Sequence, residues 1–365
     1  MKHILIDARE LRTSTGRYVE RLLHYLQRID KNHEYIVLLT PKDFDGWEPT
    51  NQHFKKVACP YKEFTFSEQT GMLKQIRNIR PDLVFSPMVQ QPVFYQGAVV
   101  TTIQDLTTVR FRNPTKNWLV FTFKQQVYKW VNKRVMRKSK LLIAPTKFVR
   151  DDAAAYSGVS RSKFTVTHES ADPLPRPAKP LPYLKNKKFI MYVGRPLPHK
   201  NLWRLIEAFR LLRRNNPDLK LVLVGKNDAM YELIKARVKQ ERVRGVVFAG
   251  FVPDASLRWL YEHCQAYVFA SLSEGFGLPA LEAMLHGAPV VSSNATCLPE
   301  VYGNAAHYFE PLKVDDIARA IREVLENKDL RKRLITRGKR QAARYSWRRL
   351  AEQTLEVFKK ALEEE

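Results

Sequence analysis

Two glutamates eight positions apart, Glu274 and Glu282, have the residue type and spacing that most clearly suggest chemistry in this chain. They lie in the stretch Ser-Leu-Ser-Glu-Gly-Phe-Gly-Leu-Pro-Ala-Leu-Glu at 271–282, directly after an apolar run at 266–270. This order predicts a strand, a glycine-bearing turn and a helix in which Pro279 takes the first position, where its missing N–H costs nothing. The backbone amides of residues 276–278 then point out of a helix N-terminus, which binds phosphate well. Carboxylates on either side of a bound anion suit a nucleotide sugar.

Two cations lie in a second candidate segment. Arg195 and Lys200 belong to Gly-Arg-Pro-Leu-Pro-His-Lys-Asn at 194–201, a proline-punctuated loop after an apolar strand. A leaving diphosphate gains charge in the transition state, and fixed cations stabilise that gain. Taken alone, Arg195 and Lys200 are more typical of two surface charges than of a binding site. His199 is interpreted as a loop residue.

Six segments in one order resemble the retaining GT-B glycosyltransferases that carry the E-x7-E motif (glycosyltransferase family 4, group 1 type). They lie at 194–201, 221–225, 248–254, 274–282, 287–293 and 298–300. The N-terminal half matches more loosely, through Thr-Gly-Arg-Tyr-Val-Glu-Arg-Leu-Leu at 15–23 and Gln-Asp-Leu at 104–106. The resemblance implies that the C-terminal half binds the sugar donor and that the N-terminal half binds the acceptor.

The resemblance also implies roles for single residues. Glu274 is expected to contact hydroxyls of the transferred sugar, Glu282 the ribose, and Arg195 and Lys200 the donor diphosphate. The backbone of Gly16, which follows the first strand, is expected to approach that diphosphate from the other domain. The donor-binding set is Gly16, Gly225, Phe251, Val252, Glu274, Gly275, Phe276, Gly277, Leu278 and Glu282, and the catalytic set is Glu274, Arg195, Lys200, Gln104 and Asp105.

Gln104 is the main departure from the family pattern. Related enzymes commonly have His-Asp at this strand end, whereas this chain has Gln104-Asp105. A glutamine can hydrogen-bond a sugar hydroxyl but cannot titrate, so the acceptor proton is expected to go to a phosphate oxygen of the donor. His168 stands where an Asn is common, and two interpretations stay open for it: a replacement base, or a structural histidine at the edge of the cleft.

A metal site is not expected. The Asp-x-Asp pattern of metal-dependent transferases occurs only as Asp43 and Asp45, and Arg195 and Lys200 already fill the cationic role at the diphosphate. We therefore expect no cofactor, with a GDP- or UDP-linked sugar as the substrate. The Gly-Arg-Tyr-Val and Gln-Asp-Leu patterns favour mannosyl-type transferases that use GDP-mannose, and UDP-sugars are the alternative.

Length and composition favour two domains. The chain has 365 residues, 44% of them hydrophobic, which is long for one core. No run approaches the roughly 18 apolar residues of a membrane span. The apolar run within residues 1–7 is too short for a signal peptide and soon meets a charged residue. A cytoplasmic protein is therefore expected. The three cysteines lack metal or redox spacing and are interpreted as reduced packing residues; they are Cys59, Cys264 and Cys297.

Apolar segments that alternate with helical patterns predict the strands. They lie at 3–6, 35–39, 83–86, 98–102 and 141–144, with a first helix at 16–29, and then at 189–193, 219–224, 246–249, 267–270 and 289–292. Continuous apolar strands separated by helices indicate parallel sheets covered on both faces. The predicted fold class is α/β, GT-B, with two doubly wound Rossmann-like domains that face a cleft and bind ligands at their strand carboxyl ends.

Five prolines within residues 172–182 mark the linker between the domains. The predicted boundaries are an acceptor-side domain at 1–175, a linker at 176–186 and a nucleotide-sugar-binding domain at 187–344. A final helix at 345–365 is implied by the resemblance to cross back to the first domain.

Positive charge is concentrated in one segment. The net charge is +25, and residues 106–150 contain twelve Lys or Arg and no Asp or Glu. A helix is expected at 117–136, with an apolar stripe of Val120, Phe123, Val127, Val131 and Val135 and an opposite face that carries Lys129, Lys133 and Arg137. An amphipathic surface helix explains the stripe. The missing acidic residues, with Trp118 and Trp130, favour an anionic membrane surface as partner, at the inner face of the cell membrane.

Two other classes of function stay open. Basic charge with interleaved aromatics is also typical of nucleic-acid-binding proteins, but that class does not explain Glu274, Glu282 or the glycine turns. A GT-B-shaped protein that binds a nucleotide sugar without turning it over is the second alternative, with Gln104 as the defect. The expected function is a retaining, metal-independent hexosyltransferase that acts on a glycan or a lipid-linked acceptor.

Overall fold

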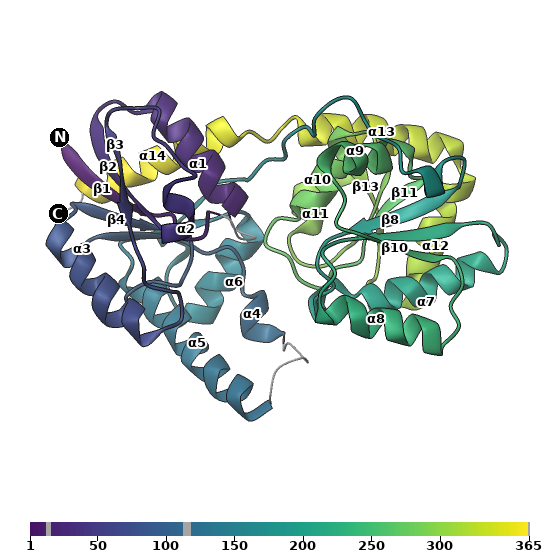
Figure 1. The fold of residues 1–365 in the computed structure, drawn as a ribbon, viewed down its shortest axis with the longest axis horizontal. Helices are drawn as coiled ribbons and strands as arrows, with labels where there is room; N and C mark the ends of the chain where they lie inside the picture. Colours follow the sequence, from purple (N-terminus) through teal and green to yellow (C-terminus); the bar gives the residue numbers. More distant parts are fainter. Residues whose placement is uncertain (12–15, 112–117, 364–365) are drawn as a thin grey trace. The chain divides into compact units, whose positions relative to one another are not determined.

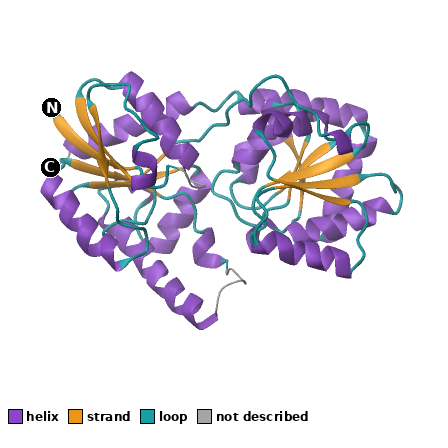
Figure 2. Cartoon of the chain, in the orientation of Figure 1, coloured by secondary structure: helices purple, strands orange, loops and turns teal. Residues whose placement is uncertain are grey.

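The computed structural model of the chain describes residues 1–11, 16–111 and 118–363, without the side chains of residues 118–121 and 123. It divides into two compact units. Unit 1 comprises residues 1–109, 122–169 and 346–365, and unit 2 comprises residues 110–121 and 170–345. In each unit a parallel sheet has helices on both faces (Figure 2), as continuous apolar strands require.

The sheet of unit 1 has seven strands in the order β3-β2-β1-β4-β5-β6-β7 (Figure 1). The strands are β1 (Lys2–Asp7), β2 (His33–Leu39), β3 (Phe54–Ala58), β4 (Leu83–Ser86), β5 (Val99–Thr102), β6 (Leu141–Ala144) and β7 (Phe164–Val166). The five predicted strands are confirmed as β1, β2, β4, β5 and β6. The prediction missed β3 and β7, the two edge strands, because a strand at an edge needs no continuous apolar run.

The helices of unit 1 come from both ends of the chain. They are α1 (Gly16–Ile29), α2 (Pro41–Phe44), η1 (Glu68–Met72), α3 (Leu73–Ile79), α4 (Thr107–Arg110), α5 (Trp118–Lys138), α6 (Lys147–Ser157), η2 (Arg161–Lys163) and α14 (Trp347–Glu363). The C-terminal helix α14 lies beside α1 (Figure 1). The ring centroid of its Phe358 is 5.0 Å from that of Phe85 in β4. The expected return of the C-terminal helix to the first domain is therefore confirmed.

The core-facing side of α5 differs from the predicted stripe. Val135 and Met136 are fully buried, and Tyr128 and Val131 pack against the same cluster, but Val127 is 46% exposed. An α-helix advances about 100° per residue, so a stripe that recurs every four residues drifts by about 40° at each step. The predicted stripe therefore leaves the core before it reaches Val127. Val120 and Phe123 lie outside the described side chains.

The sheet of unit 2 has six strands in the order β10-β9-β8-β11-β12-β13. They are β8 (Phe189–Val193), β9 (Lys220–Val224), β10 (Val246–Gly250), β11 (Ala266–Phe269), β12 (Val290–Ser293) and β13 (Ala306–Phe309). Five of them confirm the predicted segments, and the prediction missed β13, again at an edge. The helices are η3 (Pro182–Leu184), η4 (Pro198–Lys200), α7 (Leu202–Arg213), α8 (Ala229–Gln240), α9 (Asp254–His263), α10 (Leu278–Leu285), α11 (Leu298–Tyr302), η5 (Gly303–Ala305), α12 (Val314–Glu326) and α13 (Lys328–Ala342).

The three cysteines are buried, one in unit 1 and two in unit 2. Burial raises the pKa of the Cys59 thiol to about 11. A thiol with such a pKa stays protonated near neutral pH and packs as a small apolar group.

Candidate functional site

The strand order of unit 2 reverses between β8 and β11. The chain builds outward from β8 through β9 to β10, then returns to the other side of β8 and builds outward through β11 to β13. In doubly wound sheets, ligands bind outside the strand carboxyl ends at such a switch point. The two loops that leave the sheet there contain Lys200, after β8, and Glu274, after β11. The topology therefore brings the two predicted segments to the same place.

Lys200 and Glu274 form an ion pair at this switch point. The Lys200 Nζ lies 2.6 Å from the Glu274 Oε1, and the two side chains are only 18% and 11% exposed. The backbone around Glu274 is held on both sides, because its N–H donates to Thr296 Oγ1 at 3.2 Å and its carbonyl accepts from Cys297 Sγ at 3.2 Å. An ammonium has three N–H donors, so Lys200 can bind Glu274 and a ligand anion at once.

Backbone contacts connect the two loops of the pair. The N–H of Leu272 donates to the carbonyl of His199 at 2.7 Å. Asn201, which ends the first loop with a φ of 58°, donates from Nδ2 to the Pro311 carbonyl at 2.7 Å. Burial, with Lys200 next in effect, lowers the pKa of His199 to about 4, so this imidazole is neutral at pH 7. His199 thus contributes through its backbone, in agreement with its interpretation as a loop residue.

Arg195 has a different partner from Lys200. Its Nε lies 3.3 Å from Asp228 Oδ2, and its side chain is 64% exposed. Asp228 is the N-cap of α8, where Oδ1 accepts from the N–H groups of Met230 and Tyr231. Sequence reasoning did not find Asp228, although an Asp directly before a helical pattern is an N-cap signal. Arg195 therefore pairs with the N-cap residue of α8, whereas Lys200 pairs with Glu274.

The turn before α10 needs its second glycine. Gly277 has a φ of 90°, and a Cβ there would lie 2.1 Å from the Tyr302 hydroxyl oxygen. That hydroxyl donates to the Gly277 carbonyl at 2.7 Å, and the buried Phe276 ring packs 5.3 Å from the Tyr345 ring. The turn, which also contains Gly275, therefore leaves the first amides of α10, from Leu278 onward, pointing along the helix axis and out of its N-terminus, where an anion can approach them.

Glu282 lies inside α10, and its side chain is buried. It is 5% exposed, and its Oε2 accepts from the Tyr261 hydroxyl at 3.3 Å. The expected contact of Glu282 with a ribose stays a prediction.

Glycines bring three neighbouring strand ends close together. A Cβ on Gly225 would lie 2.5 Å from the Gly194 carbonyl oxygen, and Gly250 has a φ of 68°. The N–H of Gly225 donates to the Gly250 carbonyl at 3.0 Å. Directly after this cluster, Phe251 is 81% exposed while Val252 is buried. An aromatic face therefore stands in solvent at the carboxyl edge of the sheet.

The remaining predicted catalytic residues belong to unit 1. The Gln104 Nε2 lies 3.5 Å from the Pro87 carbonyl, and Asp105 Oδ1 accepts from the Thr107 N–H at 2.8 Å. Gly16 begins α1, and a Cβ on it would lie 2.1 Å from the Leu11 carbonyl oxygen. Close packing within the chain thus already requires a glycine there. A cleft between the two units stays a prediction, as does a ligand contact of Gly16.

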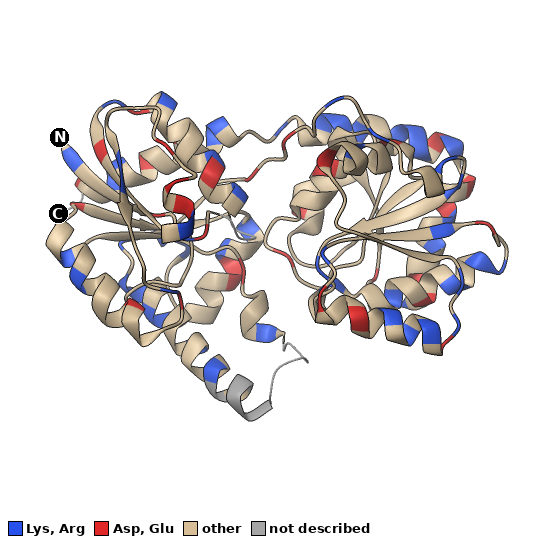
Figure 3. Cartoon of the chain, viewed as in Figure 1, with Lys and Arg blue, Asp and Glu red and all other residues tan. Residues whose placement is uncertain are grey.

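The three predicted surface cations lie along α5, close to the end of α6. The Lys133 Nζ lies 5.0 Å from the centre of the Tyr156 ring, and the Arg137 Nε donates to the Ser157 carbonyl at 3.1 Å. Lys129 is partly buried, and its carbonyl accepts from the Tyr156 hydroxyl. Lys and Arg also occur on helices of both units (Figure 3), so α5 is one basic element among several.

Possible metal ligands can be judged only within the described residues. Among the residues that the structure describes, no three His, Cys, Asp or Glu are placed to hold an ion. Asp43 is buried in α2, where its Oδ2 accepts from the Thr40 hydroxyl at 2.7 Å.

Family models match both halves of the chain. The model described as "Glycosyl transferases group 1" matches residues 178–341, and the model described as "Glycosyltransferase Family 4" matches residues 15–174. The boundary between the two matches falls in the proline-rich stretch.

Similar curated proteins include sugar-polymer enzymes. An O-antigen chain mannosyltransferase B of Escherichia coli is 33% identical over 60% of this chain and 61% of its own length. A serotype-specific mannosyltransferase WbdA of Escherichia coli is 33% identical over 48% of this chain but only 22% of its own length. A glycogen synthase of Mycobacterium tuberculosis is 27% identical over 77% of this chain and 69% of its own length. The chain therefore spans less than two thirds of both mannosyltransferases.

Similar solved structures share the fold over nearly the whole chain. Sucrose-phosphate synthase of Thermosynechococcus elongatus has a TM-score of 0.76 at 16% identity, and the match covers 99% of each chain. WaaG, a glycosyltransferase involved in lipopolysaccharide biosynthesis, has a TM-score of 0.72 at 15% identity over 97% of this chain and 99% of its own. Anabaena Alr3699/HepE in complex with UDP-glucose also has a TM-score of 0.72, at 16% identity over 99% and 100%. The two parallel-sheet, Rossmann-like units thus confirm the predicted GT-B fold class.

Proposed function

Since this chain belongs to the group 1, family 4 glycosyltransferases, we propose that it transfers a hexose from a nucleotide sugar to a glycan or lipid-linked acceptor. The proposed donor is GDP-mannose, and the proposed transfer retains the anomeric configuration. The observation that carries the proposal is the Lys200–Glu274 pair, which lies 2.6 Å apart at the switch point of unit 2.

Each part of the donor has a candidate partner in unit 2. Lys200, Arg195 and the first amides of α10 supply positive potential for the diphosphate. Glu274 accepts hydrogen bonds from the sugar hydroxyls and is held in place by Lys200. The exposed ring of Phe251 offers a face for stacking a nucleobase.

Positive groups of the protein perform the electrostatic work in the proposed reaction. As the bond from the anomeric carbon to the diphosphate breaks, negative charge develops on the leaving oxygen, and preorganised cations stabilise it. Gln104 orients a hydroxyl but takes no proton, so the acceptor proton goes to a phosphate oxygen of the donor. Positive charge at the diphosphate comes from the protein, and we propose that the reaction needs no metal.

The choice of sugar rests on the relatives. The two Escherichia coli proteins described above are named mannosyltransferases, which supports GDP-mannose. A UDP-sugar is the second candidate, because a structure with the same fold contains UDP-glucose.

Unit 1 supports the proposed membrane location. Exposed aromatic rings accompany the basic helix. The ring centroid of Trp130 in α5 lies 6.4 Å from that of Phe94, and the centroid of the exposed Phe64 lies 5.8 Å from that of the partly buried Tyr128. Phe66 is also exposed. Aromatic rings with Lys and Arg suit the interface of an anionic bilayer, here the inner face of the cell membrane. No helix in the described part of the chain is long and apolar enough to cross a membrane.

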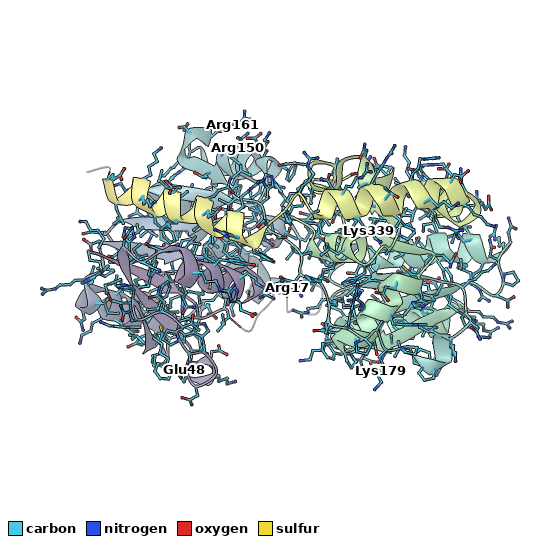
Figure 4. The ribbon with its side chains drawn as sticks, turned by 90° about the horizontal axis from the view of Figure 1, so that it is seen from above. Arg17, Glu48, Arg150, Arg161, Lys179 and Lys339 are labelled. Carbon is cyan, nitrogen blue, oxygen red and sulfur yellow. The ribbon has the colours of Figure 1, made fainter. Side chains whose placement is uncertain are left out.

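Thermal-shift measurements with a panel of GDP- and UDP-sugars test the donor. A ligand at about 100 times its dissociation constant adds roughly 2.7 kcal/mol of apparent stability, and we expect GDP-mannose to give the largest shift. Lys200→Ala is expected to remove the shift, whereas Lys339→Ala, at an exposed lysine of unit 2 labelled in Figure 4, is expected to keep it. The absence of a shift with every nucleotide sugar contradicts the proposal.

A further inference from the structure

Glu169 is a buried carboxylate that sequence reasoning passed over. It follows β7 at the carboxyl edge of the sheet in unit 1 and is 6% exposed. Buried carboxylates are normally hydrogen-bonded or paired. Glu68 of the same unit shows the normal arrangement, because it accepts from Arg9 Nη2 at 2.9 Å and from the Phe64 N–H at 3.1 Å. In the described part of the chain, the interactions of the Glu169 carboxylate are with the charges of Arg17 and Asp105 and include no hydrogen bond.

The surroundings of Glu169 come from other strand ends of unit 1. Two charges act on it: Arg17, in the first turn of α1, and Asp105, after β5. The charge of Glu169 also acts on Tyr18, whose hydroxyl oxygen lies 3.0 Å from Thr102 Oγ1. Because α1 follows β1, these residues all stand where strands of a doubly wound sheet end and ligands bind.

We propose that Glu169, Asp105 and Arg17 form an acceptor subsite, in which the Glu169 carboxylate accepts hydrogen bonds from the hydroxyl groups of a neutral sugar. This inference rests on the proposed glycosyl transfer and assigns the acceptor side of it. A carboxylate without a protein donor has lone pairs that sugar hydroxyls can satisfy.

Charge disfavours an anionic ligand. The carboxyl groups of Asp105 and Glu169 both oppose the approach of a phosphate or carboxylate group of the acceptor, since like charges repel. A metal ion is not favoured either, since no three suitable ligands are clustered in the described ranges. The acceptor end held here is therefore an uncharged, hydroxyl-bearing sugar unit.

The test compares Glu169→Gln with Glu48→Gln. Glutamine keeps the size of the side chain but donates as well as accepts, and it carries no charge. Glu48 lies on the exposed loop that leads into β3, at the amino edge of the same sheet, and Figure 4 shows it well apart from Arg17. The control thus removes one carboxylate from unit 1 without touching the proposed subsite.

Transfer is measured from GDP-mannose to methyl α-glycosides of mannose, glucose and galactose. We expect Glu169→Gln to raise the acceptor KM by roughly tenfold or more, the loss of a hydrogen bond to a charged group, with donor binding unchanged. Glu48→Gln is expected to match wild type. An unchanged acceptor KM in Glu169→Gln overturns the inference, as does a wild type that binds GDP-mannose but uses none of these glycosides.

Two further outcomes are distinguishable. If wild type binds no nucleotide sugar and transfers none, the proposed function fails, and the inference fails with it. If wild type needs Mn²⁺ and Glu169→Gln needs a much higher Mn²⁺ concentration for activity, the residues form a metal site, and only the inference is wrong.

Discussion

Lys200 and Glu274 act on neighbouring parts of the proposed donor, and each holds the other in place. Glu274→Ala is expected to fold normally and to lose about 10² or more in kcat, because a contact to the reacting sugar matters most when its charge develops. Lys200→Ala should cost a similar factor, and the double variant little more than either, since the two side chains bond to each other at 2.6 Å. Steady-state kinetics with thermal unfolding as the folding control checks this.

Arg195 extends the same test. If Arg195 and Lys200 both bind one diphosphate, their alanine variants should not be additive in kcat. Fully additive effects would instead assign Arg195 a separate role, together with its partner Asp228. A wild-type rate in Glu274→Ala would remove Glu274 from the active site.

Glu169 makes a prediction about stability at different pH values. Burial, opposed by Arg17 and reinforced by Asp105, raises its pKa from 4.5 to about 7. The folded protein therefore holds this proton more tightly than the unfolded chain, and stability falls as pH rises from about 4.5 through 7. Glu169→Gln should gain about 3 kcal/mol over wild type at pH 8 and less than about 1 kcal/mol at pH 5.

Urea unfolding of the full chain at both pH values measures the gain. Glu48→Gln, at an exposed carboxylate, is the control and should show no such pH dependence. An equal difference between Glu169→Gln and wild type at pH 5 and pH 8 would contradict a raised pKa. Sequence reasoning did not identify Glu169, because its burial depends on α1, β5 and β7 meeting in space.

At the scale of elements, the turn into α10 depends on the absence of a side chain at Gly277. Gly277→Ala is expected to cost about 1–2 kcal/mol for the left-handed backbone and a further 1–3 kcal/mol for the overlap with the Tyr302 hydroxyl, because the added Cβ would lie 2.1 Å from that oxygen. Gly287, at the other end of the same helix, is the matched control. Its φ is 76°, but the nearest atom to an added Cβ is the flexible Lys339 Cε at 3.3 Å.

Thermal unfolding of the full chain compares the two variants. Gly287→Ala should lose only the backbone part, and Tyr302→Phe should partly restore Gly277→Ala by removing the overlapping oxygen. Equal losses at both glycines would show that the hydroxyl contact has no effect.

The sequence predicted those elements whose residue pattern is set by their own burial. Strands covered on both faces, such as β8 and β9, need apolar residues at every position. The edge strand β3 contains Lys55 and Lys56 and gives no such signal. The face of α5 was predicted incorrectly because the sequence gives the size and polarity of an apolar side chain but not whether a neighbour covers it. A local signal, an Asp directly before a helix, makes Asp228 predictable as a cap. The contacts of Thr296 and Tyr302 with the Glu274 turn are not local in sequence and could not be predicted.

Helix α5 carries the membrane prediction. Lys129→Glu, Lys133→Glu and Arg137→Glu together should abolish binding to anionic liposomes, since each cation contributes about 1 kcal/mol at low salt. Wild-type binding should weaken with added salt, because screening limits the range of electrostatic attraction to about 8 Å at physiological ionic strength. Liposome sedimentation is the measurement, and donor binding should be unaffected.

A control on α13 separates the basic helix from net charge. The exposed residues Lys332, Arg333 and Arg340 lie in unit 2, and replacing them with Glu changes the charge by the same amount. This variant should still bind liposomes. Equal loss in both triples would mean that only net charge matters. Tight, sequence-preferring binding to duplex DNA without liposome binding would favour the nucleic-acid alternative.

At the scale of the whole molecule, the order of strands rather than any single motif places the candidate donor site. Lys200 and Glu274 are far apart in sequence, and they meet because β8 and β11 are neighbours in the sheet. The alternation of strands and helices predicts a doubly wound sheet, and its usual order predicts that meeting. It does not predict which cation pairs with Glu274, because Arg195 and Lys200 leave the same strand and only the folded loops decide between them.

Metal independence is the prediction that tests the whole donor site at once. Lys200, Arg195 and the N-terminus of α10 supply fixed positive potential where the diphosphate is proposed to bind, and fixed cations of this kind replace the metal that Asp-x-Asp transferases use. Mannose transfer from GDP-mannose should therefore continue in EDTA at about the untreated rate. Lys200→Ala should be poorly active with or without EDTA. This result would indicate that the positive charge of the protein, and not a metal ion, determines the rate. Complete loss of wild-type activity in EDTA, restored by Mn²⁺ or Mg²⁺, would overturn this assignment and return Asp43 and Asp45 to consideration as metal ligands.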